Sequence, residues 1–356
     1  MVSGDGAGGG LWTHLSLRGM SQHLRTRAMA AALESALGPG PWSREAVLSC
    51  GWTVAQIRQA VVTGRLVRLH RGVLHVPHPT VGRAPVVAAR VRGALLRVGT
   101  SAAASHSSAG VMRGLWLPAG NDGLVHLTRP GEPDRCDHGV RIHGSALPES
   151  QVSVLDGIPT TTIERTAIDC ARGRTLRDAL MILDSAARLL AAGEGFGERV
   201  VRESLSARRS ANDHSRTRLS EVLAFEYAWP GTAVARDACR HLEVASESPL
   251  ESWSRGLMIE SGIQRPELAY SVLGASGQHY VADFAWPWLR VLGEADGTAK
   301  YGRSSDEVAR ALRLERRRQR DLEDAGWTVV RWDSTESPVV ILARLRTALL
   351  EASRRH

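Results

Sequence analysis

Three carboxylates lie close together in the last third of this 356-residue chain. Asp283 falls within the apolar run VADFAW, and Glu294 and Asp296 fall within VLGEADG. Both runs predict β-strands, and residues two apart in a strand point to the same face of a sheet. If the strands are antiparallel neighbours, Asp283 lies opposite the other two acids. The pattern predicts a site of hard oxygen ligands for Mg²⁺ or Mn²⁺, which can polarise a phosphodiester and activate water.

A single lysine follows these acids. Lys300 is the only lysine in the chain, and it lies four residues after Asp296. A lone ammonium at this point could orient the attacking water or stabilise the charge that develops at phosphorus. The alternative is that the acids are surface residues at strand ends and that the lysine has no special role. Because burying a carboxylate within an apolar strand is costly unless it is paired or bound to metal, the set as a whole favours a site.

The surrounding sequence predicts the elements that position these residues. Ser248-Pro249-Leu250-Glu251 begins a helix, because proline suits the first turn and the following apolar residues have helical spacing, and Gly262 ends it. Three strands, an arginine-rich helix, a strand and an amphipathic helix follow, at residues 268–273, 280–286, 289–295, 306–325, 327–332 and 338–354. The predicted order is therefore α-β-β-β-α-β, followed by a last helix.

These blocks resemble the PD-(D/E)XK nuclease superfamily, most closely its branch similar to very-short-patch-repair endonucleases. The resemblance rests on SPLE, ADFAWP, GEADGTAKYGR, ERRRQRDLEDAGW and VVRW. It implies an endonuclease in which Asp283 and Glu294 are the core metal ligands. Asp296 takes the third acidic position, and Glu251 is the helix acid that completes the metal site. Phosphate contacts are implied for Arg316, Arg317 or Arg331.

One position departs from the superfamily pattern. The motif Glu-x-Lys expects lysine at position 296, where this chain has Asp296. Members of the repair-like branch also tend to have an acid there, and Lys300 could supply the cation from the next turn. If Lys300 does not reach the site, the domain is expected to bind metal but to cut poorly or not at all.

The helix predicted at 306–325 has a basic face. Its arginines recur at i, i+3, i+4 and i+7, at positions Arg313, Arg316, Arg317 and Arg320. One interpretation is a solvated face that is partly paired with Glu315 and Asp321. The other is a phosphate-binding flank, which would offset the repulsion between an acidic site and DNA. The sequence favours neither interpretation over the other.

A second functional pattern lies at residues 42–77. Ser43 is suited to cap a short helix, and Thr53 and Gln56 have the spacing of a capping box that begins a second helix. Apolar runs on both sides of a His-Arg-Gly turn predict a β-hairpin. Helix, turn, helix and hairpin together predict a winged helix-turn-helix that binds DNA, with protein contact as the alternative. Base contacts are expected from Gln56, Arg58 and Gln59, and phosphate or minor-groove contacts from Arg68, His70 and Arg71.

This segment also resembles a known family. The stretch GWTVAQIRQAVVTGRLVRLHRGVLHVP is similar to the N-terminal domain of AbiEi-like antitoxins, which are bacterial regulators of type IV toxin–antitoxin systems. The resemblance covers about a tenth of the chain. It implies DNA binding, an autoregulatory role and a cognate toxin as a partner.

Composition narrows the class of protein. The formal net charge is +8 and the pI is about 10.1, which favours a polyanionic partner such as nucleic acid. The four cysteines are far apart, which excludes a disulfide scaffold and a CxxC zinc site and fits the reducing cytoplasm. No apolar run approaches the ~18 residues of a membrane span, so no membrane partner is expected.

The length predicts two or three domains at ~150 residues each. We expect a Gly- and Ser-rich leader without a secretion signal, a winged helix-turn-helix, a mixed α/β middle domain and a nuclease-like domain, at 1–40, 41–78, 79–240 and 245–356. Within the middle domain, 199–218 is interpreted as a solvated helix and a linker. Cys136, His138 and His143 are interpreted as surface residues, because their spacing fits no standard zinc site.

The predicted fold class is α+β and multidomain. The leading hypothesis is a cytoplasmic protein that binds double-stranded DNA and hydrolyses its phosphodiester bonds with Mg²⁺ or Mn²⁺. The alternative is a non-catalytic antitoxin-type transcriptional regulator, in which the nuclease-like domain serves binding, and a third hypothesis is action on RNA. The enzyme requires the acids to meet in one cleft with Lys300 pointing in. The regulator requires dispersed or occluded acids and an exposed Gln56–Gln59 face.

Overall fold

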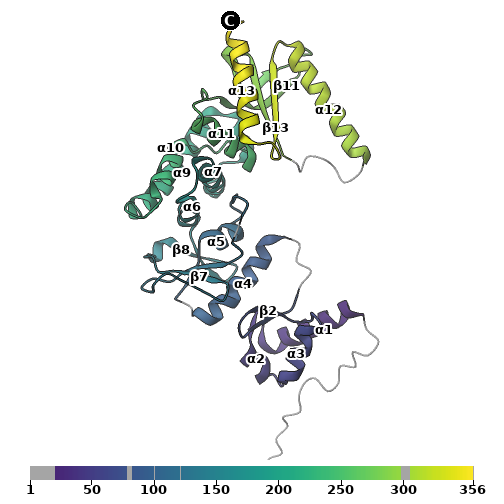
Figure 1. Ribbon diagram of the computed structural model, residues 1–356, viewed down its shortest axis with the longest axis vertical. Coiled ribbons are helices and arrows are strands. Elements are labelled where there is room, and N and C mark those ends of the chain that lie inside the picture. Colours follow the sequence, from purple (N-terminus) through teal and green to yellow (C-terminus); the bar gives the residue numbers. More distant parts are fainter. Residues whose placement is uncertain (1–20, 78–81, 100, 121, 298–304, 356) are drawn as a thin grey trace, which may run out of the picture. The chain divides into compact units, whose positions relative to one another are not determined.

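The chain forms two compact units. The computed structural model describes residues 21–77, 82–99, 101–120, 122–297 and 305–355 (Figure 1). Unit one comprises the chain up to Gly114 together with Ala119–Thr162, and unit two comprises Leu115–Pro118 and the chain from Ile163. The division at 162 falls within the range 79–240, for which a single middle domain is predicted. The six-stranded sheet with α4 and α5 belongs to unit one and the helices from α6 onward belong to unit two, because the two groups bury separate hydrophobic cores.

The first part of unit one packs helices against a small antiparallel sheet. Its elements are α1 (Gln22–Leu37), β1 (Trp42–Ser43), α2 (Arg44–Ser49), α3 (Val54–Val62), β2 (Val67–His70) and β3 (Val73–His75). Strand β3 lies between β1 and β2 and pairs with both. The Ser43 hydroxyl accepts a hydrogen bond from the Ala46 amide, and Thr53 and Gln56 form a complete capping box. Both predicted helix starts are therefore confirmed.

The second part of unit one is built on a mixed six-stranded sheet. Its strands lie in the order β6-β7-β5-β4-β9-β8, and β5 pairs in parallel with β7, as β4 does with β9. The elements are α4 (Arg83–Val98), β4 (Ala103–Ala104), α5 (His106–Arg113), β5 (Val125–Thr128), β6 (Arg135–Asp137), β7 (Val140–His143), η1 (Glu149–Gln151), β8 (Val152–Leu155) and β9 (Ile158–Thr161). Apolar residues of α4 pack on this sheet.

Unit two begins with a group of packed helices. They are α6 (Ile163–Ala171), α7 (Leu176–Gly193), α8 (Glu198–Glu203), α9 (Leu205–Phe225) and α10 (Thr232–His241). The prediction of a solvated helix and a linker at 199–218 is wrong for α9. Arg208, Asn212 and Ser215 are buried, because the side of α9 that carries Ala211 and Leu219 packs into the core of the unit. Polar residues on that side are therefore drawn into the interior.

The rest of unit two is a four-stranded sheet between helices. Its elements are α11 (Pro249–Glu260), β10 (Glu267–Leu273), β11 (His279–Trp286), η2 (Pro287–Leu289), β12 (Val291–Asp296), α12 (Ser305–Asp324), β13 (Thr328–Asp333) and α13 (Pro338–Ser353). The strand order is β10-β11-β12-β13, in which the last pair is parallel and the others are antiparallel. The predicted order of elements agrees with this sequence of helices and strands.

The sheet has a different helix layer on each face (Figure 1). Helices α11 and α13 pack on one face, against Phe284, Trp286 and Trp332. Helix α12 packs on the other face through Leu322, which contacts a core that includes Ala282 and Leu292. Apolar residues on both faces explain why the central strands read as nearly continuous hydrophobic runs.

Helix α11 is fixed closely against α7. A Cβ atom on Gly256 would lie 2.4 Å from the Cα atom of Arg177, so only glycine permits this approach. One residue earlier, the Arg255 guanidinium forms a buried ion pair with Asp184 of α7 at 2.6 Å. The N-terminal turn of α11, which carries Glu251, is thereby held in a defined position. None of the helices in the described ranges combines the length and apolarity needed to cross a membrane.

Trp332 joins the sheet to α11. It is 2% exposed, its ring stacks on Phe284 at 5.6 Å, and its indole N–H donates a hydrogen bond to Ser254 Oγ at 2.8 Å. We predict that Trp332→Ala lowers the free energy of unfolding of unit two by about 3–5 kcal/mol, because it leaves a cavity and a lost hydrogen bond. Urea denaturation followed by circular dichroism measures this change. Trp288→Ala is the matched control, because Trp288 is 46% exposed and its loss should cost under about 1 kcal/mol.

Candidate functional site

Asp283 and Glu294 lie at the point where β11 and β12 stop pairing. Phe284 is opposite Gly293 in the antiparallel register, so Asp283 and Glu294 are the next residues along the two strands. Beyond this point a side chain replaces the backbone hydrogen bonds between the two strands: the Ala295 amide donates to Asp283 Oδ2 at 2.9 Å. Glu294 is only 2% exposed. The two carboxylates predicted to be core metal ligands are therefore neighbours.

The backbone on the other side of Asp283 is irregular. In the β10–β11 register, Leu268 pairs with Phe284 and Tyr270 pairs with Ala282, and the residue between them on β10 is Ala269. Ala269 has φ +47°, in the left-handed region that costs a non-glycine residue roughly 1–2 kcal/mol. On β11, Ala282 contacts the core under α12 and Phe284 the core under α11 and α13. These two residues, two apart on β11, therefore face opposite sides of the sheet, so the strand is twisted at Asp283. Backbone strain like that of Ala269 is frequent at functional sites.

Glu251 approaches the same carboxylates from the first turn of α11. Its backbone amide donates to the Ser248 cap at 3.2 Å, and its Oε2 accepts from the Glu247 amide at 2.9 Å. Burial raises the pKa of Glu251 to about 7, and the negative charge of Asp283 is the next largest cause. The helix acid implied by the family resemblance is therefore within electrostatic reach of Asp283.

Arg318 is a residue of this site that the sequence analysis missed. Its Nη2 lies 2.6 Å from Glu294 Oε1 and 2.8 Å from the Val281 carbonyl oxygen. The sequence did indicate this position, because Arg318 lies one helical turn before Leu322 and on the same side of α12. Leu322 is fully buried. The basic face predicted from the sequence is exposed instead; it comprises Arg313, Arg316, Arg317 and Arg320.

Asp296 lies in a second charged group beside the first. Arg331 of β13 contacts Asp296 Oδ2 at 3.3 Å and also forms an ion pair with Glu315 of α12. A cavity of about 290 Å³ opens here, at the carboxyl ends of the parallel strands, lined by Asp296, Arg331, Asp333, Glu336 and Arg344. Glu315 therefore pairs with Arg331, and Asp321 accepts hydrogen bonds from Ser276 at 2.7 Å. Among the described residues, the ion pairs that one interpretation expects between these two acids and the exposed arginines of α12 do not form.

Negative charge is in excess among the buried acids. Burial raises the pKa of Glu294 to about 8, Asp283 adds to the effect, and Arg318 and Arg331 oppose it. Two carboxyls beside Asp283 are thus pushed toward the neutral form. Across the described residues, however, no three His, Cys, Asp or Glu side chains are grouped closely enough to hold a metal ion together. Lys300, the remaining predicted site residue, lies outside the described residues.

In unit one, the predicted DNA-contacting residues of α3 and the hairpin are exposed with one exception. Gln56, Arg58, Gln59, Arg68 and Arg71 are all on the surface, although the Gln56 side-chain oxygen is used in the capping box. The expectation that His70 contacts phosphate is wrong. His70 is 4% exposed, and its Nε2–H donates to the Arg90 carbonyl of α4 at 2.8 Å, because α4 packs against this hairpin.

A histidine cluster on the six-stranded sheet was not foreseen. His126 Nδ1 lies 3.0 Å from His143 Nε2, and His126 Nε2 lies 3.0 Å from an Asp122 carboxylate oxygen. His106 stacks on His143 with ring centroids 3.6 Å apart. His143 therefore contacts His106 of α5 and His126 of β5. Cys136, which the sequence places near His143, is exposed on β6.

Similarity to known proteins extends over most of the chain without naming an activity. No protein-family model matches it. The uncharacterized proteins Rv2248 and MT2308, from two strains of Mycobacterium tuberculosis, are each 26% identical over 278 residues, covering 78% of this chain and 89% of theirs. The solved structure of the RV2827C protein from Mycobacterium tuberculosis is similar with a TM-score of 0.34 and 14% identity, covering 70% of this chain and 88% of that one.

The raised pKa of Glu294 predicts a pH-dependent stability. Because its folded pKa of about 8 is above its ordinary value of 4.5, the folded chain holds this proton more tightly than the unfolded chain. The folding stability that the Glu294 proton provides is therefore complete below about pH 4.5 and is lost as pH rises through about 8. We expect Glu294→Gln to remove this loss, so that its stability relative to wild type improves by roughly 3–4 kcal/mol between pH 5 and pH 8.

Urea titrations at a series of pH values measure this difference. Glu323→Gln is the control, because Glu323 is exposed on α12, the helix that carries the Glu294 partner Arg318. If the unfolding free energies of wild type and Glu294→Gln change in parallel with pH, Glu294 does not have the raised pKa of a buried carboxyl.

Proposed function

We propose that unit two is a metal-dependent phosphodiester hydrolase that acts on DNA. The observation that carries the proposal is the pair of neighbouring acids Asp283 and Glu294, with Glu251 within electrostatic reach. The proposal of a PD-(D/E)XK-like domain is supported by the order α-β-β-β-α-β from α11 to β13 and by the parallel pairing of its last two strands. The relatives name no competing activity.

The donor set suits a divalent cation with oxygen ligands. Mg²⁺ is commonly held by one or two carboxylates and keeps several waters, so a third protein ligand is not required. Asp283 and Glu294 would hold the ion, and Glu251 would add negative charge nearby. A bound ion would relieve the repulsion that raises the carboxyl pKa values, and it would supply Lewis acidity and a more acidic water. Arg318, once released from Glu294, would be free to donate to a phosphate oxygen.

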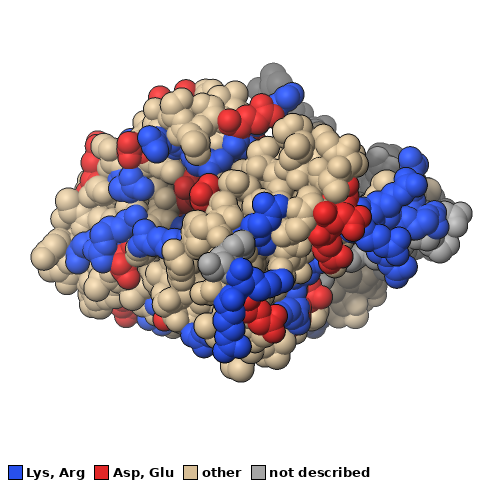
Figure 2. All heavy atoms as spheres, turned by 90° about the horizontal axis from the view of Figure 1, so that it is seen from above, with Lys and Arg blue, Asp and Glu red and all other residues tan. Residues whose placement is uncertain are grey.

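Basic groups for DNA are distributed in local clusters. Figure 2 shows basic and acidic side chains interspersed over one face of the molecule, without a continuous field of one sign. The exposed arginines of α12, including Arg316 and Arg317, form one basic segment in the same domain as the carboxylates. Their charge would offset the repulsion between DNA phosphates and the acidic site.

The proposed role of unit one is to bind duplex DNA through a winged helix-turn-helix. Support comes from the order α1-β1-α2-α3-β2-β3, from the central position of β3, and from the exposed polar face of α3. In such domains the second helix of the motif enters the major groove and the hairpin contacts the backbone.

A non-catalytic regulator of the AbiEi antitoxin type is the second candidate, and a specific observation favours it. Arg318 binds Glu294 and Arg331 binds Asp296, so protein cations neutralise two of the acids. Asp296 also replaces the lysine of the nuclease pattern. In this alternative the domain keeps its fold for binding DNA or a toxin, and the arginines stabilise a site that no longer cleaves.

Cleavage of plasmid DNA distinguishes the two candidates. We predict that wild type nicks supercoiled plasmid in the presence of Mg²⁺ or Mn²⁺, that EDTA abolishes nicking, and that Asp283→Asn lowers the rate at least about 100-fold because a core ligand is lost. Agarose gel electrophoresis over time measures the rates. Asp324→Asn is the matched control, since Asp324 is exposed at the end of α12.

Metal binding gives a second readout that does not depend on activity. Mn²⁺ should raise the thermal unfolding temperature of wild type at pH 8, and Asp283→Asn should lose this effect. Metal stabilisation without cleavage would favour the regulator. The absence of both effects in wild type would overturn the metal-dependent hydrolase.

DNA binding by unit one is tested separately. We predict that the double variant Arg58→Ala, Gln59→Ala binds a labelled duplex from upstream of its own coding sequence about 10- to 100-fold more weakly, because two base-edge contacts are lost. Fluorescence anisotropy measures the affinity at fixed salt. Arg354→Ala, an exposed position at the other end of the chain, controls for the loss of one positive charge. Equal affinities for wild type and the double variant would contradict a recognition role for α3.

A further inference from the structure

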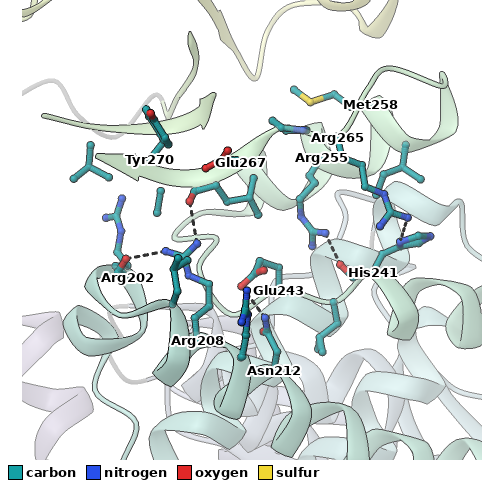
Figure 3. A pocket seen from close by; sticks show the side chains of 18 of the residues that line it. Arg202, Arg208, Asn212, His241, Glu243, Arg255, Met258, Arg265, Glu267 and Tyr270 are labelled. Carbon is teal, nitrogen blue, oxygen red and sulfur yellow. Dashed lines mark hydrogen bonds between the residues drawn. The ribbon is translucent and has the colours of Figure 1, made fainter. Parts of the chain in front are cut away.

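Unit two contains a large basic pocket away from the carboxylates. Its volume is about 950 Å³, and it lies between helices α8, α9, α10 and α11 and the edge strand β10, with part of β11 (Figure 3). Seven arginines and two histidines line it, against three glutamates. A concentration of guanidinium groups of this kind is suited to phosphate, which guanidinium can bind through two parallel hydrogen bonds.

Two of these arginines build the walls. Arg208 of α9 donates to the carbonyl oxygens of Val201, Arg202 and Leu268 at 3.0, 2.7 and 3.0 Å. Figure 3 shows Arg208 beside Arg202. Arg255 of α11 donates to the His241 carbonyl oxygen and pairs with Asp184. Both side chains are largely buried: Arg208 holds α8 and α9 against β10, and Arg255 holds α11 against α7 and α10.

The arginines at the rim are available to a ligand. Arg209 is exposed and has no hydrogen-bond or ion-pair partner among the residues that the structure describes. Arg265 is also exposed, and its guanidinium lies 3.0 Å from His241 Nδ1 (Figure 3). Burial lowers the pKa of His241, the charge of Arg265 adds to this effect, and Asp237 opposes it.

The pocket is connected to the carboxylates by two sets of contacts. Arg202 forms an ion pair with Glu247, whose amide donates to Glu251 Oε2 at 2.9 Å. Val281 lines the pocket, and its carbonyl oxygen accepts from Arg318, which binds Glu294. Asp283 lies two residues beyond Val281 on β11. The pocket and the acids therefore share β11 and the start of α11.

The lining also includes apolar and aromatic surface. Leu268 and Ile263 lie among the arginines, and Tyr270 of β10 borders the pocket while its ring packs beside Trp327, with centroids 6.0 Å apart (Figure 3). Grooves that combine positive charge with an aromatic ring are typical of single-stranded nucleic-acid binding, because bases stack while phosphates are neutralised. The volume lies within the range that encloses a small molecule, which suits a few nucleotides of one strand and is too small for a duplex.

We propose that this pocket binds the phosphodiester backbone of a single nucleic-acid strand and guides that strand toward Asp283 and Glu294. The role as a guide rests on the proposed hydrolase, but binding is measurable without cleavage. Arg209 and Arg265 neutralise phosphates, and Leu268 and Ile263 provide apolar surface beside the bases. Arg208 and Arg255 keep the pocket open.

The test is the affinity of the full chain for fluorescein-labelled dT12 in EDTA, measured by anisotropy at several salt concentrations. The double variant Arg209→Gln, Arg265→Gln should bind at least about tenfold more weakly, and the slope of log K against log salt should fall by roughly 1, as expected for the loss of one to two phosphate contacts on a single strand. Arg174→Gln, an exposed arginine of the same unit outside the pocket, should behave as wild type. Thermal unfolding confirms that each variant is folded.

The same comparison in the Arg58→Ala, Gln59→Ala background removes the contribution expected from unit one. An rU12 probe shows whether the strand is RNA or DNA, since both share the phosphodiester chemistry. Equal affinity and equal salt dependence for wild type and the double variant would overturn the proposal. Loss of oligonucleotide binding in the pocket variant, combined with no cleavage by wild type, would support the pocket and reject the hydrolase.

Discussion

The repulsion between buried carboxylates is the constraint on which the candidate site depends. Glu251, Asp283 and Glu294 come from three elements, and burial makes their mutual repulsion strong. Such a group is tolerated only where cations or protons compensate it. Arg318 from α12 supplies one cation, and Arg331 from β13 supplies another nearby. The helix and the strand that follow the acids in sequence are thus required for the acids to remain buried.

The surrounding packing serves the same constraint. Gly256 and the Arg255–Asp184 ion pair hold α11 against α7, and Trp332 ties α11 to the sheet. These contacts keep Glu251 near Asp283 although their charges repel. The left-handed Ala269 opposite Asp283 is a further local cost that the rest of the domain sustains. A site of this kind is adapted to receive positive charge, either from a metal ion or from the protein itself.

Arginine performs both structural and surface roles in this chain. Arg208 and Arg255 are buried and donate to carbonyl oxygens or a carboxylate, whereas Arg209 and Arg316 lie on the surface. Composition cannot distinguish these roles, because the side chain is the same in each. The environment distinguishes them: a buried guanidinium needs partners for its donors, and an exposed guanidinium remains available to phosphate.

The sequence by itself determined the order of elements, the helix caps at Ser43 and Thr53, and the neighbouring positions of Asp283 and Glu294. These features depend on local spacing, which the chain carries directly. Only the tertiary structure decided that Arg318 binds Glu294, that α4 buries His70, and that α9 belongs to the core. Each of these depends on which face of an element meets a partner far away in sequence, because packing between distant segments, rather than local pattern, sets burial and charge pairing.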